Sequence, residues 1–184
     1  PGDAATTLRV GMIGAVPATL GPGFERRFGV RLCDVYGLTE LEPIALPRPG
    51  ERPPAGSCGR AVGDLEVVVL DEDDRVLPAG AVGEIAVRPR VPDVLMAGYD
   101  DDDAATREAC RGGWFHTGDL GRIDEDGFVY FVDRMRHAIR HGGENVSSWE
   151  LESIVGQHPA VRECAAVGVP SPLGEQDVMV VARA

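Results

Sequence analysis

Apolar and polar residues follow two different periods along this chain, and the change of period predicts a change of structure. Residues 8–14 and 29–36 are short apolar runs with a weakly helical stretch, broken by Gly and Pro, between them. This pattern is typical of two strands in an α/β layer. A Pro-rich stretch at 46–57 has the composition of a stiff loop. The first part of the chain is therefore predicted to be α/β.

The middle of the chain has the two-residue period of β-strands. Residues 64–70 and 83–88 flank an acidic segment that contains Gly and Pro, and residues 121–124 pair naturally with 128–132 across Glu-Asp-Gly. A glycine suits the left-handed position of such a turn. We expect a β-rich, barrel-like subdomain over residues 55–133.

The last fifty residues predict a helix followed by two strands. Ser147 and Glu150 have the spacing of a capping box, an apolar stripe follows, and Gly156 ends the pattern. Apolar runs at 161–169 and 177–184 come next. We predict a small, truncated α+β domain, and expect the chain to be a piece of a longer protein.

The composition excludes several classes of function. A formal net charge of −12 argues against binding nucleic acid through the overall field, because phosphates need clustered cations. All 18 basic residues are arginine, so a lysine-bearing phosphate loop and a Schiff-base mechanism are excluded for this chain. The four cysteines form no CxxC pair. With no predicted membrane span or signal peptide, we expect a cytoplasmic protein.

The stretch Tyr36-Gly37-Leu38-Thr39-Glu40 follows an apolar run and is the first candidate site. Ligands of open α/β sheets bind beyond the carboxyl ends of strands. There a ring stacks on a base, a glycine admits close backbone approach, a hydroxyl donates to phosphate, and a carboxylate holds Mg²⁺. The alternative is a tight turn with polar residues facing solvent.

Two further stretches carry candidate chemistry. In "GWFHTGDLGRIDEDGF", Asp119 precedes a hairpin, and its two oxygens suit the two hydroxyls of a ribose, although an Asx turn is the alternative. In "DRMRHAIRHGGENVSSWELE", several arginines suit a phosphate or carboxylate, although a solvated basic hairpin is the alternative. His137 and His141 have the i,i+4 spacing of a zinc helix, but the glycines after them argue against a helix there.

Taken in order, "YGLTE" and the two stretches above resemble the adenylate-forming superfamily, which includes acyl-CoA synthetases, luciferases and the adenylation domains of peptide synthetases. Within it, "FVDR", "GGENVS" and "HPAVRECAAVGVPSPLGEQ" are most similar to AMP-forming acyl-CoA synthetases of the crotonobetaine/carnitine-CoA ligase type. The resemblance covers essentially the whole chain. It implies an ATP-dependent carboxylic acid:CoA ligase that makes an acyl-adenylate and pyrophosphate, and then an acyl-CoA and AMP.

The resemblance also implies the cofactors, ATP and Mg²⁺, and coenzyme A as co-substrate. It places Tyr36 along the adenine with Gly37 beside it, Thr39 at the phosphate, and Glu40 on Mg²⁺. The chemistry agrees, because adenylation builds negative charge on phosphorus that a metal ion and fixed donors stabilise.

Further roles follow from the same resemblance. Gly14 and Ala15 would line the adenine and acyl pocket, and Asp119 would hold the ribose hydroxyls with Arg134 nearby. Residues 1–54 would then be the end of a large α/β nucleotide-binding domain with its linker.

Members of the superfamily rotate their C-terminal domain between two half-reactions, and the motif places this hinge at 134–136, centred on Arg136. Many members have aspartate or lysine at that position. Arg140 stands where a catalytic lysine is common, and Gly142 and Gly143 would border the pantetheine tunnel. Residues 137–184 would be the C-terminal domain.

The phosphate loop and the distal catalytic lysine of the family are not in this sequence, so we predict that this chain alone is inactive. Three functions remain open: a CoA ligase, an enzyme that loads a carrier protein or stops at the acyl-adenylate, and a non-catalytic nucleotide-binding or interaction module. The acid is not readable from these residues, and carnitine-like, fatty and aromatic acids all remain open.

Overall fold

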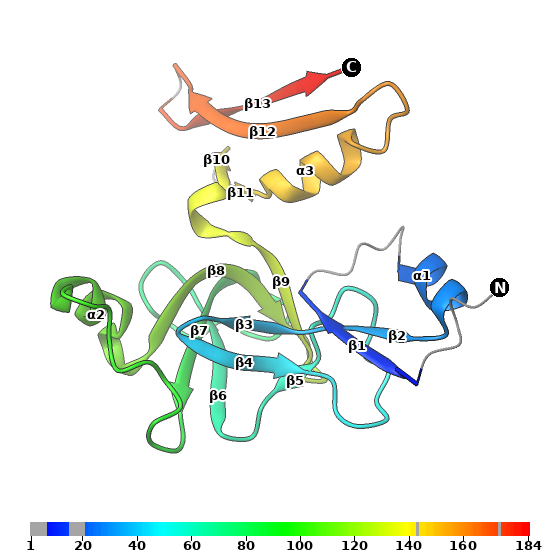
Figure 1. Ribbon diagram of the computed structural model, residues 1–184. Helices are drawn as coiled ribbons and strands as arrows, with labels where there is room; N and C mark the ends of the chain where they lie inside the picture. Colours follow the sequence, from blue (N-terminus) through cyan, green and yellow to red (C-terminus); the bar gives the residue numbers. More distant parts are fainter. Residues whose placement is uncertain (1–6, 15–20, 143, 173) are drawn as a thin grey trace. The chain divides into compact units, whose positions relative to one another are not determined.

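The computed structural model describes residues 7–14, 21–142, 144–172 and 174–184 (Figure 1). The chain divides into two compact units, of which unit 1 comprises Pro1–Thr117 and Gly121–Phe131, and unit 2 comprises Gly118–Leu120 and Val132–Ala184. Both units contain strands, and helices occur in each, so the predicted mixed α/β character is confirmed.

Unit 1 begins with the predicted strand, helix and strand. Strand β1 (Val10–Ile13) pairs in parallel with β2 (Arg31–Asp34), and helix α1 (Gly21–Phe28) precedes β2. The helix ends where Gly29 has a φ of +67°, a conformation that glycine adopts without steric cost. Glu25 of the helix accepts a hydrogen bond from the backbone N–H of Leu32 at 2.8 Å, which ties α1 to β2.

A three-stranded sheet follows in the order β3-β4-β5. Its strands are β3 (Tyr36–Leu38), β4 (Leu41–Leu46) and β5 (Arg60–Ala61), and both pairings are antiparallel. The expectation that residues 36–40 leave a strand for a loop is therefore wrong in part. Strand β2 ends at Asp34, but Tyr36 then opens a new short strand, and Thr39 and Glu40 form the turn of a hairpin.

The middle of the chain forms a four-stranded sheet in the order β6-β7-β8-β9. These strands are β6 (Leu65–Leu70), β7 (Gly83–Pro89), β8 (Phe115–Ile123) and β9 (Val129–Arg134). Both predicted hairpins are present, and Gly127 in the second turn has a φ of +80°. In the described residues β6 and β9 remain the edges of this sheet, so it does not close, and the barrel-like description is not confirmed.

The apolar core of unit 1 is formed by residues from both of these sheets. Gly121 shows how closely the strands pack, because a Cβ built there would lie 2.5 Å from Ile85 Cδ1 and 2.6 Å from Tyr130 O. Only glycine fits at such a contact. The buried cluster comprises Tyr36, Leu41, Ile44, Ala45, Cys58, Leu65, Ile85, Val87 and Val129.

A short helix, α2 (Asp103–Ala109), lies in the connection between β7 and β8. Its N-cap is Asp102, whose side chain accepts a hydrogen bond from Ala105 N at 2.9 Å. None of the helices in the described part of the chain is long and apolar enough to cross a membrane.

Unit 2 contains the predicted helix and two strands of the C-terminal region. The hairpin of β10 (Ile139–His141) and β11 (Glu144–Val146) leads into α3 (Ser148–Val155), and α3 is followed by the antiparallel pair β12 (Glu163–Pro170) and β13 (Gln176–Arg183). Helix α3 packs along β12 (Figure 1). Glu152 fixes this packing by accepting a hydrogen bond from Ala166 N at 2.9 Å.

The predicted start of α3 is confirmed. Ser147 is the N-cap, and its hydroxyl accepts a hydrogen bond from Glu150 N at 3.1 Å. Such a cap satisfies one of the backbone donors that a helix leaves free at its first turn. The helix gives way to Gly156, as the sequence predicts.

Candidate nucleotide-binding site and hinge

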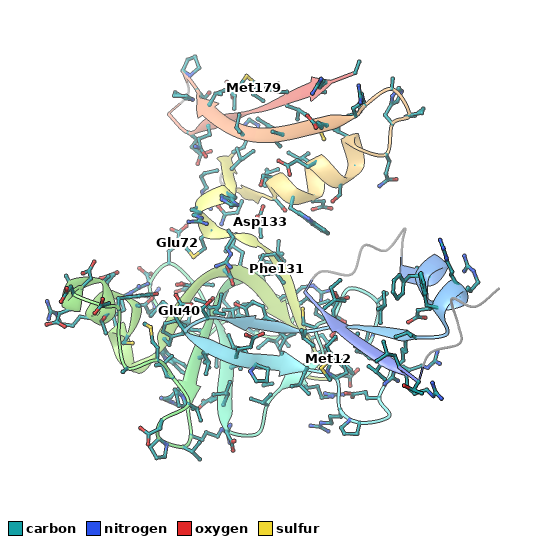
Figure 2. The ribbon with its side chains drawn as sticks, in the orientation of Figure 1. Met12, Glu40, Glu72, Phe131, Asp133 and Met179 are labelled. Atoms are coloured by element: carbon teal, nitrogen blue, oxygen red, sulfur yellow. The ribbon has the colours of Figure 1, made fainter. Side chains whose placement is uncertain are left out.

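The turn between β3 and β4 carries the predicted phosphate and metal residues of unit 1. Thr39 is exposed, and Glu40, which is labelled in Figure 2, is half-buried. Gly37 in β3 faces Glu42 in the neighbouring strand β4. A Cβ built on Gly37 would lie 3.0 Å from Glu42 Cγ. The glycine therefore allows close pairing inside the hairpin, which is a structural reason for its presence beside any role toward a ligand.

Glu40 is held at two points by one later segment of the chain. Its side-chain Oε1 accepts a hydrogen bond from the Tyr99 hydroxyl at 2.8 Å, and its backbone oxygen accepts one from Met96 N at 2.9 Å. Burial raises the pKa of Tyr99, and the hydrogen bond to the Glu40 carboxylate raises it further. Tyr99 therefore stays a neutral donor at physiological pH.

Tyr99 was not singled out by the sequence analysis. Glu40 and Tyr99 are 59 positions apart, so no local sequence pattern predicts their contact. A sequence signal does exist for the segment around Tyr99, because Gly98 and the following acidic run predict a turn that leads into a capped helix.

The ring of Tyr36 is part of the apolar core of unit 1. It is 6% exposed, and its centroid lies 6.2 Å from that of Phe131. Such burial leaves little of the ring for a nucleotide base in this structure, and its stacking on adenine stays a prediction. Among the described residues, no heavy atom lies within 4 Å of a Cβ built on Gly14, and Ala15 lies outside the described residues.

In unit 2 the predicted ribose ligand, Asp119, is fully buried and paired with Arg134. Arg134 Nε lies 3.0 Å from Asp119 Oδ1, and the arginine side chain is 42% exposed. The structure thus brings together two residues that the sequence analysis placed at one site. If Asp119 binds a ribose as predicted, the ribose would share the carboxylate with this guanidinium or replace it.

A partly buried polar cluster in unit 1 surrounds His116, the residue that precedes Thr117-Gly118-Asp119. His116 is buried, and its Nδ1 lies 2.8 Å from Glu84 Oε2 while its Nε2 lies 4.0 Å from Asp74 Oδ1. Arg111 completes the cluster, with Nη2 3.6 Å from Glu84 Oε2 and Nε 3.4 Å from Asp74 Oδ2. These contacts tie the start of β8 to β7 and to the acidic loop after β6.

Asp133 is a buried polar centre of unit 2, near the end of β9 and close to the start of α3 (Figure 2). Its Oδ2 accepts hydrogen bonds from the hydroxyls of Ser147 at 3.0 Å and Ser148 at 3.2 Å. Trp149 N also lies 3.4 Å from Oδ2, and Arg134 N donates to Oδ1 at 2.7 Å. A carboxylate at the first turn of a helix satisfies its free N–H groups and its dipole.

The predicted hinge residue, Arg136, is exposed on a single 3₁₀ turn, Met135–His137, directly after β9. Arg140 lies in β10, where its backbone N donates to Gln176 Oε1 at 2.9 Å and its side chain donates to Asn145 Oδ1 at 3.3 Å. Gly142 has a φ of +61° in the β10–β11 turn, and Gly143 lies outside the described residues. Arg140 is thus the one arginine within the β10–β11 strands, and Arg136 lies before this hairpin.

The described residues contain no group of three or more His, Cys, Asp or Glu side chains that could hold a metal ion by themselves. Magnesium in nucleotide sites is usually held by one or two carboxylates together with phosphate oxygens and water. Glu40 fits this kind of site, because it is a half-buried carboxylate with one oxygen fixed by a neutral donor.

Two family models match the chain in order. The model of the AMP-binding enzyme matches residues 2–99, and that of the AMP-binding enzyme C-terminal domain matches residues 150–183. The chain belongs to the AMP-binding enzyme family, which confirms the resemblance drawn from its motifs.

Curated relatives and solved structures agree with this assignment. The chain is 40% identical over 157 residues to the crotonobetaine/carnitine-CoA ligase of Salmonella heidelberg, which covers 84% of this chain and 30% of the relative. The chain therefore spans about a third of the length of the curated relatives it matches.

Two solved structures share its fold. An O-succinylbenzoate coenzyme A synthetase from Bacillus subtilis, in complex with ATP and magnesium ion, is 29% identical with a TM-score of 0.78, and the match covers 94% of this chain and 35% of that one. An amide bond synthetase from Marinactinospora thermotolerans is 35% identical with a TM-score of 0.75, over 94% and 35% of the two chains.

Proposed function

We propose that this chain is part of an ATP-dependent carboxylic acid:CoA ligase that forms an acyl-adenylate and then an acyl-CoA. The observation that carries the proposal is the 40% identity to a crotonobetaine/carnitine-CoA ligase across 84% of the chain, together with two ordered family matches. Because the chain spans about a third of such a relative, we also propose that it does not complete the reaction alone.

The residues divide the work in unit 1 as follows. Glu40 would hold a magnesium ion that neutralises charge on the phosphates, and Thr39 would donate a hydrogen bond to a phosphate oxygen. Tyr36, Gly37, Gly14 and Ala15 would form the wall beside the adenine. What supports this division is the family match over residues 2–99, which includes all of these positions.

In unit 2 Asp119 would accept hydrogen bonds from the ribose hydroxyls, with Arg134 balancing its charge. Their ion pair supports this proposal, since Arg134 Nε lies 3.0 Å from the buried carboxylate and supplies an opposite charge beside it. We propose the finer domain limits on the same basis, with a β-rich subdomain at 55–133, a hinge at 134–136 and a C-terminal domain at 137–184. Arg136 would be the pivot, and Arg140, Gly142 and Gly143 would face the thioester-forming arrangement.

The test is a product screen on the longer protein that carries this sequence. The protein is incubated with ATP, Mg²⁺, CoA and a panel of carnitine-like, fatty and aromatic acids, and acyl-CoA is detected by mass spectrometry. We expect an acyl-CoA product and AMP with at least one acid. Absence of both acyl-CoA and pyrophosphate with every acid would favour a non-catalytic nucleotide-binding module.

A variant in the same protein tests the role of Asp119. Asp119→Ala removes both ribose acceptors, and we expect ATP binding to weaken by about 1.5–3 kcal/mol, the usual cost of losing hydrogen bonds to a charged group. Isothermal titration with a non-hydrolysable ATP analogue measures this. Asp126→Ala, on the exposed tip of the β8–β9 hairpin, is the control and should bind as the parent protein does. Equal affinity of the two variants would contradict the assignment.

A second candidate is an enzyme that passes the acyl-adenylate to an acceptor other than CoA. The 35% identity to an amide bond synthetase favours it, since that protein has the same fold and a different named product. Parallel reactions with free CoA, a holo carrier protein and a simple amine separate the candidates, because only one acceptor should consume the adenylate rapidly.

A further inference from the structure

We propose that Tyr99 is a positioning residue for Glu40: it holds the carboxylate so that the second oxygen, Oε2, points to a bound divalent cation. The proposal rests on the proposed function, in which Glu40 is the metal ligand. Its direct basis is the hydrogen bond from the Tyr99 hydroxyl to Glu40 Oε1 at 2.8 Å.

The geometry of this bond suits a metal-ligating carboxylate. Within the described part of the chain, Tyr99 is the one hydrogen-bond partner of the Glu40 side chain, and it occupies a single oxygen. Carboxylates that bind metals are commonly oriented by a hydrogen bond to their other oxygen, and losing such a partner weakens metal binding about 10- to 100-fold. A neutral phenol orients the carboxylate without competing for it as a cation would.

Tyr99 is itself held in place by α2. Its backbone N–H donates to Thr106 Oγ1 at 2.9 Å, and the same hydroxyl donates to Asp102 O at 3.0 Å. Gly98 has a φ of +150°, and a Cβ there would lie 3.2 Å from Thr106 Oγ1, so the chain before Tyr99 passes directly against the helix. The tyrosine is therefore presented by a capped helix and its turn.

The same segment also fixes the backbone of Glu40. Met96 N donates to Glu40 O at 2.9 Å, so the segment 96–99 contacts both the main chain and the side chain of Glu40. Two contacts from one connection restrict both the position of Glu40 and its side-chain rotation.

Mn²⁺ is the probe for the test, because its paramagnetism reports binding directly. Its affinity for the longer ligase with a bound non-hydrolysable ATP analogue is measured by electron paramagnetic resonance. We expect Tyr99→Phe to weaken Mn²⁺ binding about 10-fold or more, with metal-free binding of the analogue unchanged. Tyr130→Phe, which removes a hydroxyl bonded to Asp124 in the same unit, is the matched control and should leave Mn²⁺ affinity unchanged.

A second pair of variants keeps the test independent of Tyr99 itself. Thr106→Val removes the hydroxyl that holds the Tyr99 backbone, and it should weaken Mn²⁺ binding to a smaller degree, whereas Thr106→Ser keeps the hydroxyl and should restore the affinity.

The outcomes separate this proposal from the one on which it rests. If Glu40→Gln loses Mn²⁺ affinity but Tyr99→Phe stays within twofold of the parent, the positioning role is wrong and the proposed function stands. If Glu40→Gln also leaves Mn²⁺ affinity unchanged while acyl-CoA is still produced, Glu40 is not the metal ligand and the Tyr99 proposal falls with that assignment. If no acyl-CoA, adenylate or pyrophosphate is formed, it is the proposed function that fails.

Discussion

The two units of this chain are stabilised by different kinds of interaction. Unit 1 has a contiguous apolar cluster between two sheets, with Ile44, Ile85 and Val87 fully buried. In unit 2 the buried apolar side chains among the described residues are few: Leu120, Ile139 and Ala166. A buried polar group also contributes there, because the carboxylate of Asp133 accepts hydrogen bonds from Ser147 and Ser148 at the start of α3.

This difference predicts how each unit responds to change. Burial of apolar surface has no preferred direction, so a sheet core tolerates small rearrangements but loses free energy with every methyl group removed. Hydrogen bonds to one carboxylate are directional and fail together when that carboxylate is lost. Unit 1 should therefore be sensitive to the volume of its side chains, and unit 2 to the chemistry of one residue.

The largest effect is expected in the core of unit 1. Ile85 is fully buried, and a Cβ built on Gly121 would lie only 2.5 Å from Ile85 Cδ1. The side chain therefore fills the space beside the backbone of Gly121, and its removal leaves a cavity there. Ile85→Ala should lower the free energy of unfolding by about 2–5 kcal/mol. Denaturant unfolding followed by tryptophan fluorescence and by amide exchange in β7 and β8 measures it.

Val82→Ala is the matched control, since Val82 is 51% exposed just before β7 and should change stability by less than about 0.5 kcal/mol. Equal losses in the two variants would mean that the apolar cluster does not stabilise unit 1 as described.

In unit 2 the corresponding change is Asp133→Ala. It leaves the buried hydroxyls of Ser147 and Ser148 without their shared acceptor, and we expect a loss of about 1–3 kcal/mol. Hydrogen exchange of the amides in α3 and β12 reads the local stability. Asp133→Asn, which keeps one acceptor oxygen, should lose less.

Glu163→Ala is the control for unit 2, because its side chain is 75% exposed and its ion pair with Arg183 is a surface contact. Should Asp133→Ala leave α3 as protected as this control does, then the apolar contacts of α3 with β12 are sufficient, and the contrast between the units disappears.

The parts of this architecture that the sequence predicts are those with a local period or a local cap. Helix α3 is an example, because the Ser147 cap and the apolar stripe lie within one short segment. The β8–β9 hairpin is another, because Gly127 supplies its left-handed turn residue. In both cases the residues that decide the structure are neighbours in the sequence.

The parts that the sequence did not predict either lack a readable local pattern or depend on partners far along the chain. The β3–β4 hairpin was missed because Pro43 interrupts β4 and because three residues are too few to show a strand period. The contacts of Glu40 with Tyr99 and of Asp133 with Ser148 join residues 59 and 15 positions apart. Motif resemblance identified Glu40, Asp119 and Arg134 as a set, but it carried no information about which side chains orient them.

The smallest expected effect concerns a directional polar contact in unit 1, the hydrogen bonds that Asp124 accepts in the β8–β9 turn. Burial raises the pKa of Asp124, but hydrogen bonds from Phe128 N at 2.8 Å and from the Tyr130 hydroxyl at 3.0 Å outweigh it, and the net pKa lies below the ordinary value. A carboxylate whose pKa is lowered by folding stabilises the native state above its unfolded pKa, which is about 3.9, and loses that contribution as the pH falls through the folded value.

Tyr130→Phe removes one of these donors, so the pKa of Asp124 should rise toward its ordinary value, and the acid-induced loss of the β8–β9 turn should begin at a higher pH. Carboxyl carbon shifts followed by NMR between pH 6 and pH 2, in steps of about half a unit, give the midpoint. Arg75→Ala, on the exposed loop after β6, is the control that should leave the midpoint of Asp124 unchanged. If the titration midpoint of Asp124 is also unchanged in Tyr130→Phe, the backbone donor Phe128 N alone lowers this pKa. The β8–β9 turn would then depend less on side-chain hydrogen bonds than the first turn of α3 does.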